Sequence, residues 1–158
     1  MELIRAAQPD AKNVLELGCG TGSILKCLHD AYQVSGLDVS GKMLSVARKK
    51  VPSSKLFGQD MVDFRIDGRF DVIFCVFDSI NHVRRFSDWK KVFAAVFRHL
   101  FPGGCFIFDI NTQRKLRTPH RRATLGASVW KKPVGHRRDR ASERRIKLEC
   151  QSVRTPEW

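Results

Sequence analysis

Strand-like and helix-like segments alternate five times between residues 13 and 111, and this alternation constrains the fold more than any other feature. Short apolar segments of strand length lie at residues 13–17, 33–38, 54–60, 70–78 and 105–111. The run "FDVIFCVFD" shows no polar alternation, as is typical of a parallel strand covered on both faces. Helical periodicity occurs at residues 23–31, 41–50 and 86–101. We therefore predict an α/β protein with a doubly wound, mainly parallel sheet and right-handed crossovers.

The charge distribution divides the 158-residue chain into two parts. Residues 1–112 carry 15 Lys and Arg against 12 Asp and Glu, whereas residues 113–158 carry 14 against 4. The second part also lacks a sustained apolar period, apart from a short helical pattern near residues 141–150. We expect a folded core at 1–112 and a basic, poorly ordered extension at 113–158, with the sheet incomplete at its C-terminal end.

Cysteine usage and hydropathy indicate the compartment. The five cysteines form no CxxC pair and are odd in number, and no apolar run reaches the roughly 20 residues of a membrane span. The N-terminus lacks the apolar centre of a secretory signal. The simplest interpretation is a reduced, cytoplasmic protein with no membrane partner and no metal site.

A glycine-rich turn, "LELGCGTG" at residues 15–22, follows the first strand directly. Glycines let a ligand approach the main chain, and the next helix supplies free N–H groups at its start. Ligands of open α/β sheets bind at this edge. Asp38 lies 20 residues after Gly18, at the end of the second strand, where a carboxylate can accept hydrogen bonds from both hydroxyls of a ribose. The position of Asp38 suits NAD and S-adenosylmethionine equally, whereas a nicotinamide-type turn would read GxGxxG rather than the GxGxG found here.

Further motifs distinguish these two cofactors. The ordered set "VLELGCGTG", "GLDVS", "GQDMVDF", "FDVIFCVFDSINHV" and "HLFPGGCFIFDINT" resembles the successive motifs of class I S-adenosylmethionine-dependent methyltransferases. The resemblance covers residues 12–112. It implies a Rossmann-like core that binds S-adenosylmethionine. The cofactor-binding residues that it implies are Glu16, Gly18, Cys19, Gly20, Gly22, Asp38, Val39, Asp60, Met61 and Asp78.

The resemblance also assigns roles within this set. Glu16, Gly18 and Gly20 line the methionine and ribose side, and Cys19 contributes its backbone amide. Asp38 binds the ribose hydroxyls. Asp60 and Met61 frame the adenine. Asp78, after the fourth strand, faces the sulfonium region.

The stretch "DSINHV" supplies the candidate catalytic residues, His82 and Asn81. A nitrogen acceptor must be neutral and an oxygen acceptor must lose its proton, so a general base assists either reaction. His82 is expected to act as that base or to orient the acceptor, and Asn81 to position it. A helix-capping histidine and a plain turn residue are the alternatives.

The leading function is methyl transfer to nitrogen or oxygen of a small molecule, because "DSIN" departs from the Pro-Pro-aromatic signature of amino-methylating nucleic-acid enzymes. A second hypothesis is an RNA or protein methyltransferase that uses the basic tail as a tether. A third is a non-catalytic fragment. The short N-terminus and Arg-rich tail fit a truncated or frame-shifted member of the family. Neither the acceptor nor the oligomeric state is indicated.

Overall fold

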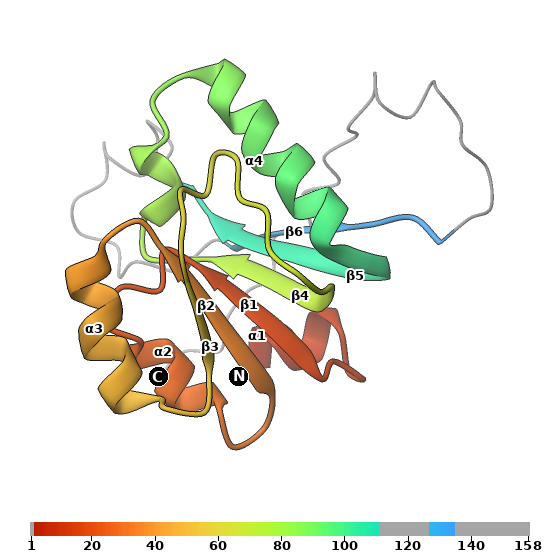
Figure 1. The fold of residues 1–158 in the computed structure, drawn as a ribbon. Helices are drawn as coiled ribbons and strands as arrows, with labels where there is room; N and C mark the ends of the chain where they lie inside the picture. Colours follow the sequence, from red (N-terminus) through yellow and green to blue (C-terminus); the bar gives the residue numbers. More distant parts are fainter. Residues whose placement is uncertain (1, 111–126, 135–158) are drawn as a thin grey trace, which may run out of the picture.

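A computed structural model describes residues 2–110 and 127–134, which form one mixed sheet flanked by helices (Figure 1). The sheet has six strands in the order β3-β2-β1-β4-β5-β6, and β1 to β5 are parallel. The strands are β1 (Asn13–Leu17), β2 (Gln33–Asp38), β3 (Lys55–Gly58), β4 (Phe70–Cys75), β5 (Leu100–Asp109) and β6 (Ala127–Lys131). The helices are α1 (Glu2–Ala7), α2 (Ser23–Leu28), α3 (Gly41–Lys50), α4 (Phe86–His99) and the 3-10 helix η1 (Ser79–His82). The Rossmann-like α/β fold predicted from the sequence is confirmed.

The strand order reverses beside β1, and this reversal places the site. The chain runs from β1 outward through β2 to β3, and then crosses over to β4 on the other side of β1. Glu16 of β1 therefore lies level with Phe74 of β4 on one side and with Gly36 of β2 on the other. At such a reversal the two connections leave in opposite directions, which opens a crevice at the carboxyl ends of the strands.

Two apolar layers cover the two faces of the sheet. α1, α2 and α3 pack on one face and α4 on the other (Figure 1). Neighbouring residues of β1 alternate between them, with Val14 in the first core and Leu15 in the second. Phe64, from the connection between β3 and β4, is fully buried on the α4 side. This connection is therefore part of the second layer.

The ends of α3 and α4 show how the sequence sets the helix boundaries. Ser40 caps α3, its hydroxyl accepting from the Met43 amide at 3.4 Å. α4 ends at His99, two residues earlier than predicted, because β5 already begins at Leu100. The Lys132 ammonium donates to the carbonyls of Phe97 (2.9 Å) and Leu100 (2.8 Å) at this end of α4.

Two elements differ from the sequence prediction. α1 precedes the first predicted strand, burying Ile4 and Ala7, which are three residues apart. β6 lies within 113–158, where no regular element except a short helix was expected, and it pairs antiparallel with β5. That expectation is wrong for residues 127–131. The boundary at residue 112 and the helix near 141–150 fall outside the described residues. Across residues 2–110 and 127–134, no helix has both the length and the apolar character needed to span a bilayer.

Candidate functional site

The glycine turn between β1 and α2 is held against the end of β2. The amides of Gly18 and Cys19 both donate to the Leu37 carbonyl, at 2.7 and 3.0 Å. The Gly20 amide donates to Oδ2 of Asp38 at 2.8 Å. The turn is thus fixed to the end of β2 by three of its backbone amides, through the Leu37 carbonyl and the Asp38 carboxylate.

Gly18 and Gly20 both have positive φ angles, +72° and +52°, but their surroundings differ. A Cβ at Gly18 would lie 2.9 Å from both Cβ and Oγ of Ser79, so this glycine permits close packing of η1. A Cβ at Gly20 would meet no atom within 4 Å. Gly20 therefore borders open space, as expected of a cradle for a ligand.

Two of the predicted residues in this turn face the protein interior. Gly22 packs on α3, where a Cβ would lie 3.1 Å from that of Ala47. The Cys19 thiol is buried against Gly36, and burial raises its pKa to about 12. The Cys19 side chain is therefore a packing group, and its backbone amide is the part that serves the turn.

Glu16 is a buried carboxylate without a complete set of partners. Its side chain is 3% exposed, and within the described part of the chain Oε2 has no hydrogen-bond partner. Burial, with a smaller contribution from the charge of Asp38, raises the pKa of Glu16 to about 8. An unsatisfied buried carboxylate is costly, so this oxygen marks a place where a donor or cation is missing.

Asp38 is the most fully engaged acid of the site. Its Oδ2 accepts from Gly20, and its Oδ1 accepts from the Ser40 amide at 2.8 Å. Each carboxylate oxygen keeps a second lone pair. Asp38 can therefore accept two further hydrogen bonds from a ligand without losing the bonds that orient it.

A cavity of about 580 Å³ opens at the carboxyl edge of the sheet and collects half of the predicted site residues. These are Gly18, Asp38, Val39, Asp60, Met61 and His82. Asp60 sits in a local turn, its Oδ1 accepting from the Val62 amide at 2.9 Å. Glu16, Cys19, Gly20, Gly22, Asp78 and Asn81 do not line this cavity.

The segment after β4 has a strained backbone. Phe77 and Asp78 have φ angles of +55° and +63°, a region that costs non-glycine residues about 1–3 kcal/mol each. The Asp78 amide donates to both carboxylate oxygens of the buried Asp109 at 3.4 Å, and the Asn81 amide donates to the Asp78 carbonyl at 2.9 Å. These bonds hold the turn, so that η1 presents His82, an exposed side chain, at the cavity.

The cavity also contains residues that the sequence analysis missed. Ser79 packs on Gly18 and lines the cavity, and Gln59, Arg84 and Arg85 lie on its wall. Ser79 and Gln59 lie inside the quoted motifs, and their position next to predicted site residues is the only sequence feature that could have identified them. The two arginines precede α4 and carry no such signal.

Comparisons with known proteins identify the family. Residues 14–104 match a methyltransferase domain family. A dTDP-3-amino-3,6-dideoxy-alpha-D-glucopyranose N,N-dimethyltransferase from Streptomyces fradiae is 33% identical over 108 residues, which are 68% of this chain and 42% of that relative. The chain spans about half the length of the curated relatives that it matches.

Solved structures agree with this assignment. An S-adenosylmethionine-dependent methyltransferase from Clostridium acetobutylicum superimposes with a TM-score of 0.68 and 38% identity, covering 73% of this chain and 49% of that one. S-adenosylmethionine-bound CalS10, an amino pentose methyltransferase from Micromonospora echinaspora, gives a TM-score of 0.67 and 29% identity, covering 86% of this chain and 61% of that one. The chain belongs to the class I S-adenosylmethionine-dependent methyltransferases.

Proposed function

We propose that this protein binds S-adenosylmethionine at the carboxyl edge of the sheet and transfers its methyl group to an amine of a small molecule. The observation that carries the proposal is the position of Asp38. Its carboxylate lines the cavity, is oriented by two backbone amides and retains free lone pairs for two hydroxyl groups. A ribose offers a matching pair of adjacent hydroxyls.

Two further features fit this cofactor. Glu16 presents an unpartnered, buried carboxylate oxygen beside the glycine turn, where the cationic amino group of a methionine moiety supplies the missing partner. Gly20 leaves space where a side chain would otherwise obstruct the ligand. Asp60 and Met61, on the cavity wall, are then the residues that frame the adenine.

When bound, S-adenosylmethionine supplies a methyl group already activated by its sulfonium charge. The protein therefore needs to orient an acceptor, exclude water and accept a proton. His82 lines the cavity and is exposed, so its imidazole can receive a proton from the acceptor and release it to solvent. Asn81 donates through Nδ2 to Oδ1 of Asp78 at 3.3 Å, which orients both side chains on this turn.

An amine is favoured as acceptor because the Streptomyces fradiae relative is named as an N,N-dimethyltransferase and CalS10 as an amino pentose methyltransferase. Both of these acceptors are small molecules. The basic segment that motivates the RNA or protein hypothesis lies largely outside the described residues, and that hypothesis stays a prediction.

The test is a calorimetric titration with S-adenosylhomocysteine, the demethylated product. We expect micromolar binding, and Asp38→Ala should weaken it by at least about thirtyfold because hydrogen bonds to a charged group contribute roughly 1.5–3 kcal/mol each. Asp67→Ala, which removes an exposed acid that does not line the cavity, is the matched control. A folded protein that binds no S-adenosylhomocysteine contradicts the proposal.

The acceptor class is tested on the same protein with isotopically labelled methyl donor and a panel of amino sugars. Each amino sugar is paired with the matching sugar that carries a hydroxyl in place of the amine. Labelling of the amines alone supports the assignment. Labelling of the hydroxyl compounds alone contradicts it.

A further inference from the structure

Residues 59–66, between β3 and β4, form a loop that joins the cofactor cavity to the end of α4. The first part of this loop, Gln59 to Val62, lines the cavity, whereas Phe64 is fully buried under α4. One end of the loop thus belongs to the proposed adenine wall, and the other belongs to the core.

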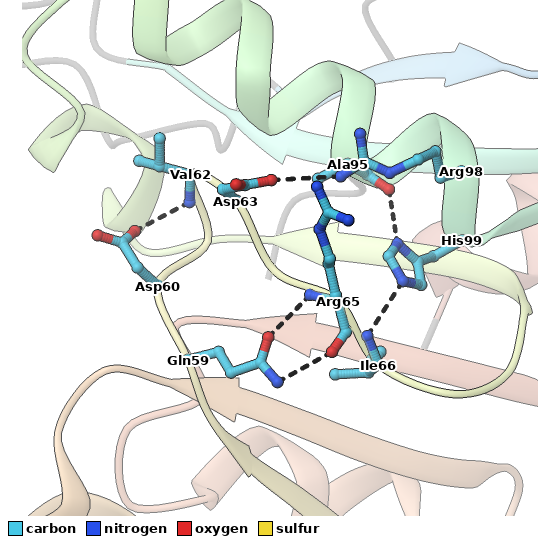
Figure 2. Close-up of polar contacts among 9 residues, drawn as sticks. All are labelled: Gln59, Asp60, Val62, Asp63, Arg65, Ile66, Ala95, Arg98 and His99. Atoms are coloured by element: carbon cyan, nitrogen blue, oxygen red, sulfur yellow. Dashed lines mark hydrogen bonds and ion pairs between the residues drawn. The ribbon is translucent and has the colours of Figure 1, made fainter.

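His99, in the last turn of α4, fastens the core end of this loop. Its side chain is buried, and the Ile66 amide donates to Nε2 at 3.3 Å (Figure 2). Because Nε2 accepts, the ring proton lies on Nδ1, which donates to the Ala95 carbonyl at 2.7 Å. The imidazole also stacks on Phe64, with ring centroids 4.6 Å apart. His99 is therefore held as the neutral Nδ1–H tautomer.

A second set of hydrogen bonds, within the loop, connects its core end to the residues that line the cavity. The Gln59 side-chain amide accepts from the Arg65 amide at 2.8 Å and donates to the Arg65 carbonyl at 3.0 Å (Figure 2). Arg65 is next to Ile66, and Gln59 is next to Asp60. Fixing Ile66 on His99 therefore fixes, through this reciprocal pair, the residues that precede Asp60 and Met61.

We propose that His99 is a positioning residue for the cofactor site: its imidazole fastens the loop 59–66 to α4 and thereby strengthens cofactor binding. The inference rests on the proposed function. A loop ordered in advance has already lost the conformational entropy that binding otherwise removes. A side chain without a hydrogen-bond acceptor at position 99 would remove this tie to the Ile66 amide, so the loop must then be ordered by the ligand itself.

The experiment titrates S-adenosylhomocysteine into three proteins at one pH. The wild type is compared with His99→Gln, which keeps an acceptor near Nε2, and with His99→Leu, which removes it. Glu16 and His82 are present in all three proteins, so the ratio of dissociation constants isolates position 99.

We expect the wild type and the Gln variant to bind equally, and the Leu variant to bind about five- to tenfold more weakly. A Gln variant that folds but binds as weakly as the Leu variant overturns the proposal. So does a Leu variant that is less stable but binds with unchanged affinity, because the bond is then merely structural.

Exchange of the Ile66 amide hydrogen, measured by NMR at a single pH, gives a readout that needs no ligand. The amide should be protected in the wild type and the Gln variant and should exchange faster in the Leu variant. If the Leu variant does not fold, His99→Asn, whose shorter side chain withdraws the acceptor from the Ile66 amide, takes its place. Absence of any binding by the folded wild type refutes the proposed function, and Ile66 exchange unaffected by the Leu substitution refutes the fastening itself.

Discussion

Substitution of Gly18 by Ala tests whether the glycine turn and η1 are packed as tightly as the structure shows. Two costs are expected. The left-handed backbone at φ +72° costs a non-glycine residue about 1–2 kcal/mol. The new Cβ would lie 2.9 Å from both Cβ and Oγ of Ser79, and overpacking of this kind costs about 1–3 kcal/mol. We expect a total loss of about 3 kcal/mol in the free energy of unfolding.

The two costs are separated by a double-mutant cycle with Ser79→Gly. This second change removes the side chain that the new Cβ meets, at the expense of the hydrogen bond from Ser79 Oγ to the Val76 carbonyl. The double variant should therefore recover the overpacking part, giving a coupling energy of about 1–2 kcal/mol. Ser79→Ala is the matched control, because it removes Oγ but leaves Cβ 2.9 Å from the new group, so only partial recovery is expected.

The assay is urea denaturation followed by circular dichroism, with the slope compared among variants to confirm the same unfolding transition. A coupling energy within about 0.3 kcal/mol of zero would refute the packing argument. Gly18 would then be required for its φ angle alone, and the position of η1 would not depend on it.

Three further predictions concern other parts of the molecule. Lys132→Met should destabilise the protein by about 2 kcal/mol in urea, because two carbonyls at the end of α4 lose a charged donor, whereas Lys131→Met, at an exposed neighbour, should have little effect. Glu16 binds its proton more tightly in the folded protein, where its pKa is about 8, so its contribution to stability is lost as the pH rises toward that value. Glu16→Gln should therefore become more stable relative to the wild type between about pH 5 and pH 9, by roughly 3 kcal/mol. Urea titrations of both proteins at each pH measure this difference. A thiol reagent, with sites mapped by mass spectrometry, should modify the exposed Cys27 in the native protein well before the three buried thiols, Cys19, Cys75 and Cys105.

The parts of the fold that the sequence predicts are those whose signals are local. The run from Val72 to Cys75 is apolar throughout because both faces of β4 are covered, and this pattern needs no knowledge of its neighbours. α1 is different: with only six residues, its two buried positions cannot establish a helical period. β6 also has no local signal, because its five residues lie among basic residues in the sequence. It becomes a strand by pairing with β5 at the edge of the sheet.

The candidate site divides in the same way. Gly18, Asp38 and Asp60 follow strands in the sequence, so their gathering at one edge of the sheet follows from the fold class. The positive φ angles of Phe77 and Asp78 could not be predicted, because Asp adopts this region more often than most residues but a bulky Phe does not, and the sequence marks neither position. They depend on Asp109, 31 residues later in the chain.

His99 shows the limit of local reasoning most clearly. In the sequence it is one of five histidines, and it stands at the end of an amphipathic helix as the first residue of the segment "HLFPGGCFIFDINT", where nothing local gives it a role. Its importance comes from Ile66, 33 residues earlier, and from Phe64, which buries its ring. Long-range hydrogen bonds of this kind leave no periodic trace in a sequence.

Glu16 and Asp38 together indicate where binding energy is available in the unbound protein. Asp38 accepts hydrogen bonds from two backbone amides, so its orientation is fixed. Glu16 is buried beside that charge with an oxygen unpartnered within the described residues, and its raised pKa expresses this cost. A ligand that brings a cation to Glu16 offsets the free-energy cost of burying that carboxyl group. If the same ligand brings hydroxyl groups to Asp38, it binds to a carboxylate that is already oriented. Glu16→Gln should therefore stabilise the free protein and weaken its binding of S-adenosylhomocysteine at the same time. This is the result expected of a residue that is kept for ligand binding although it lowers the stability of the fold.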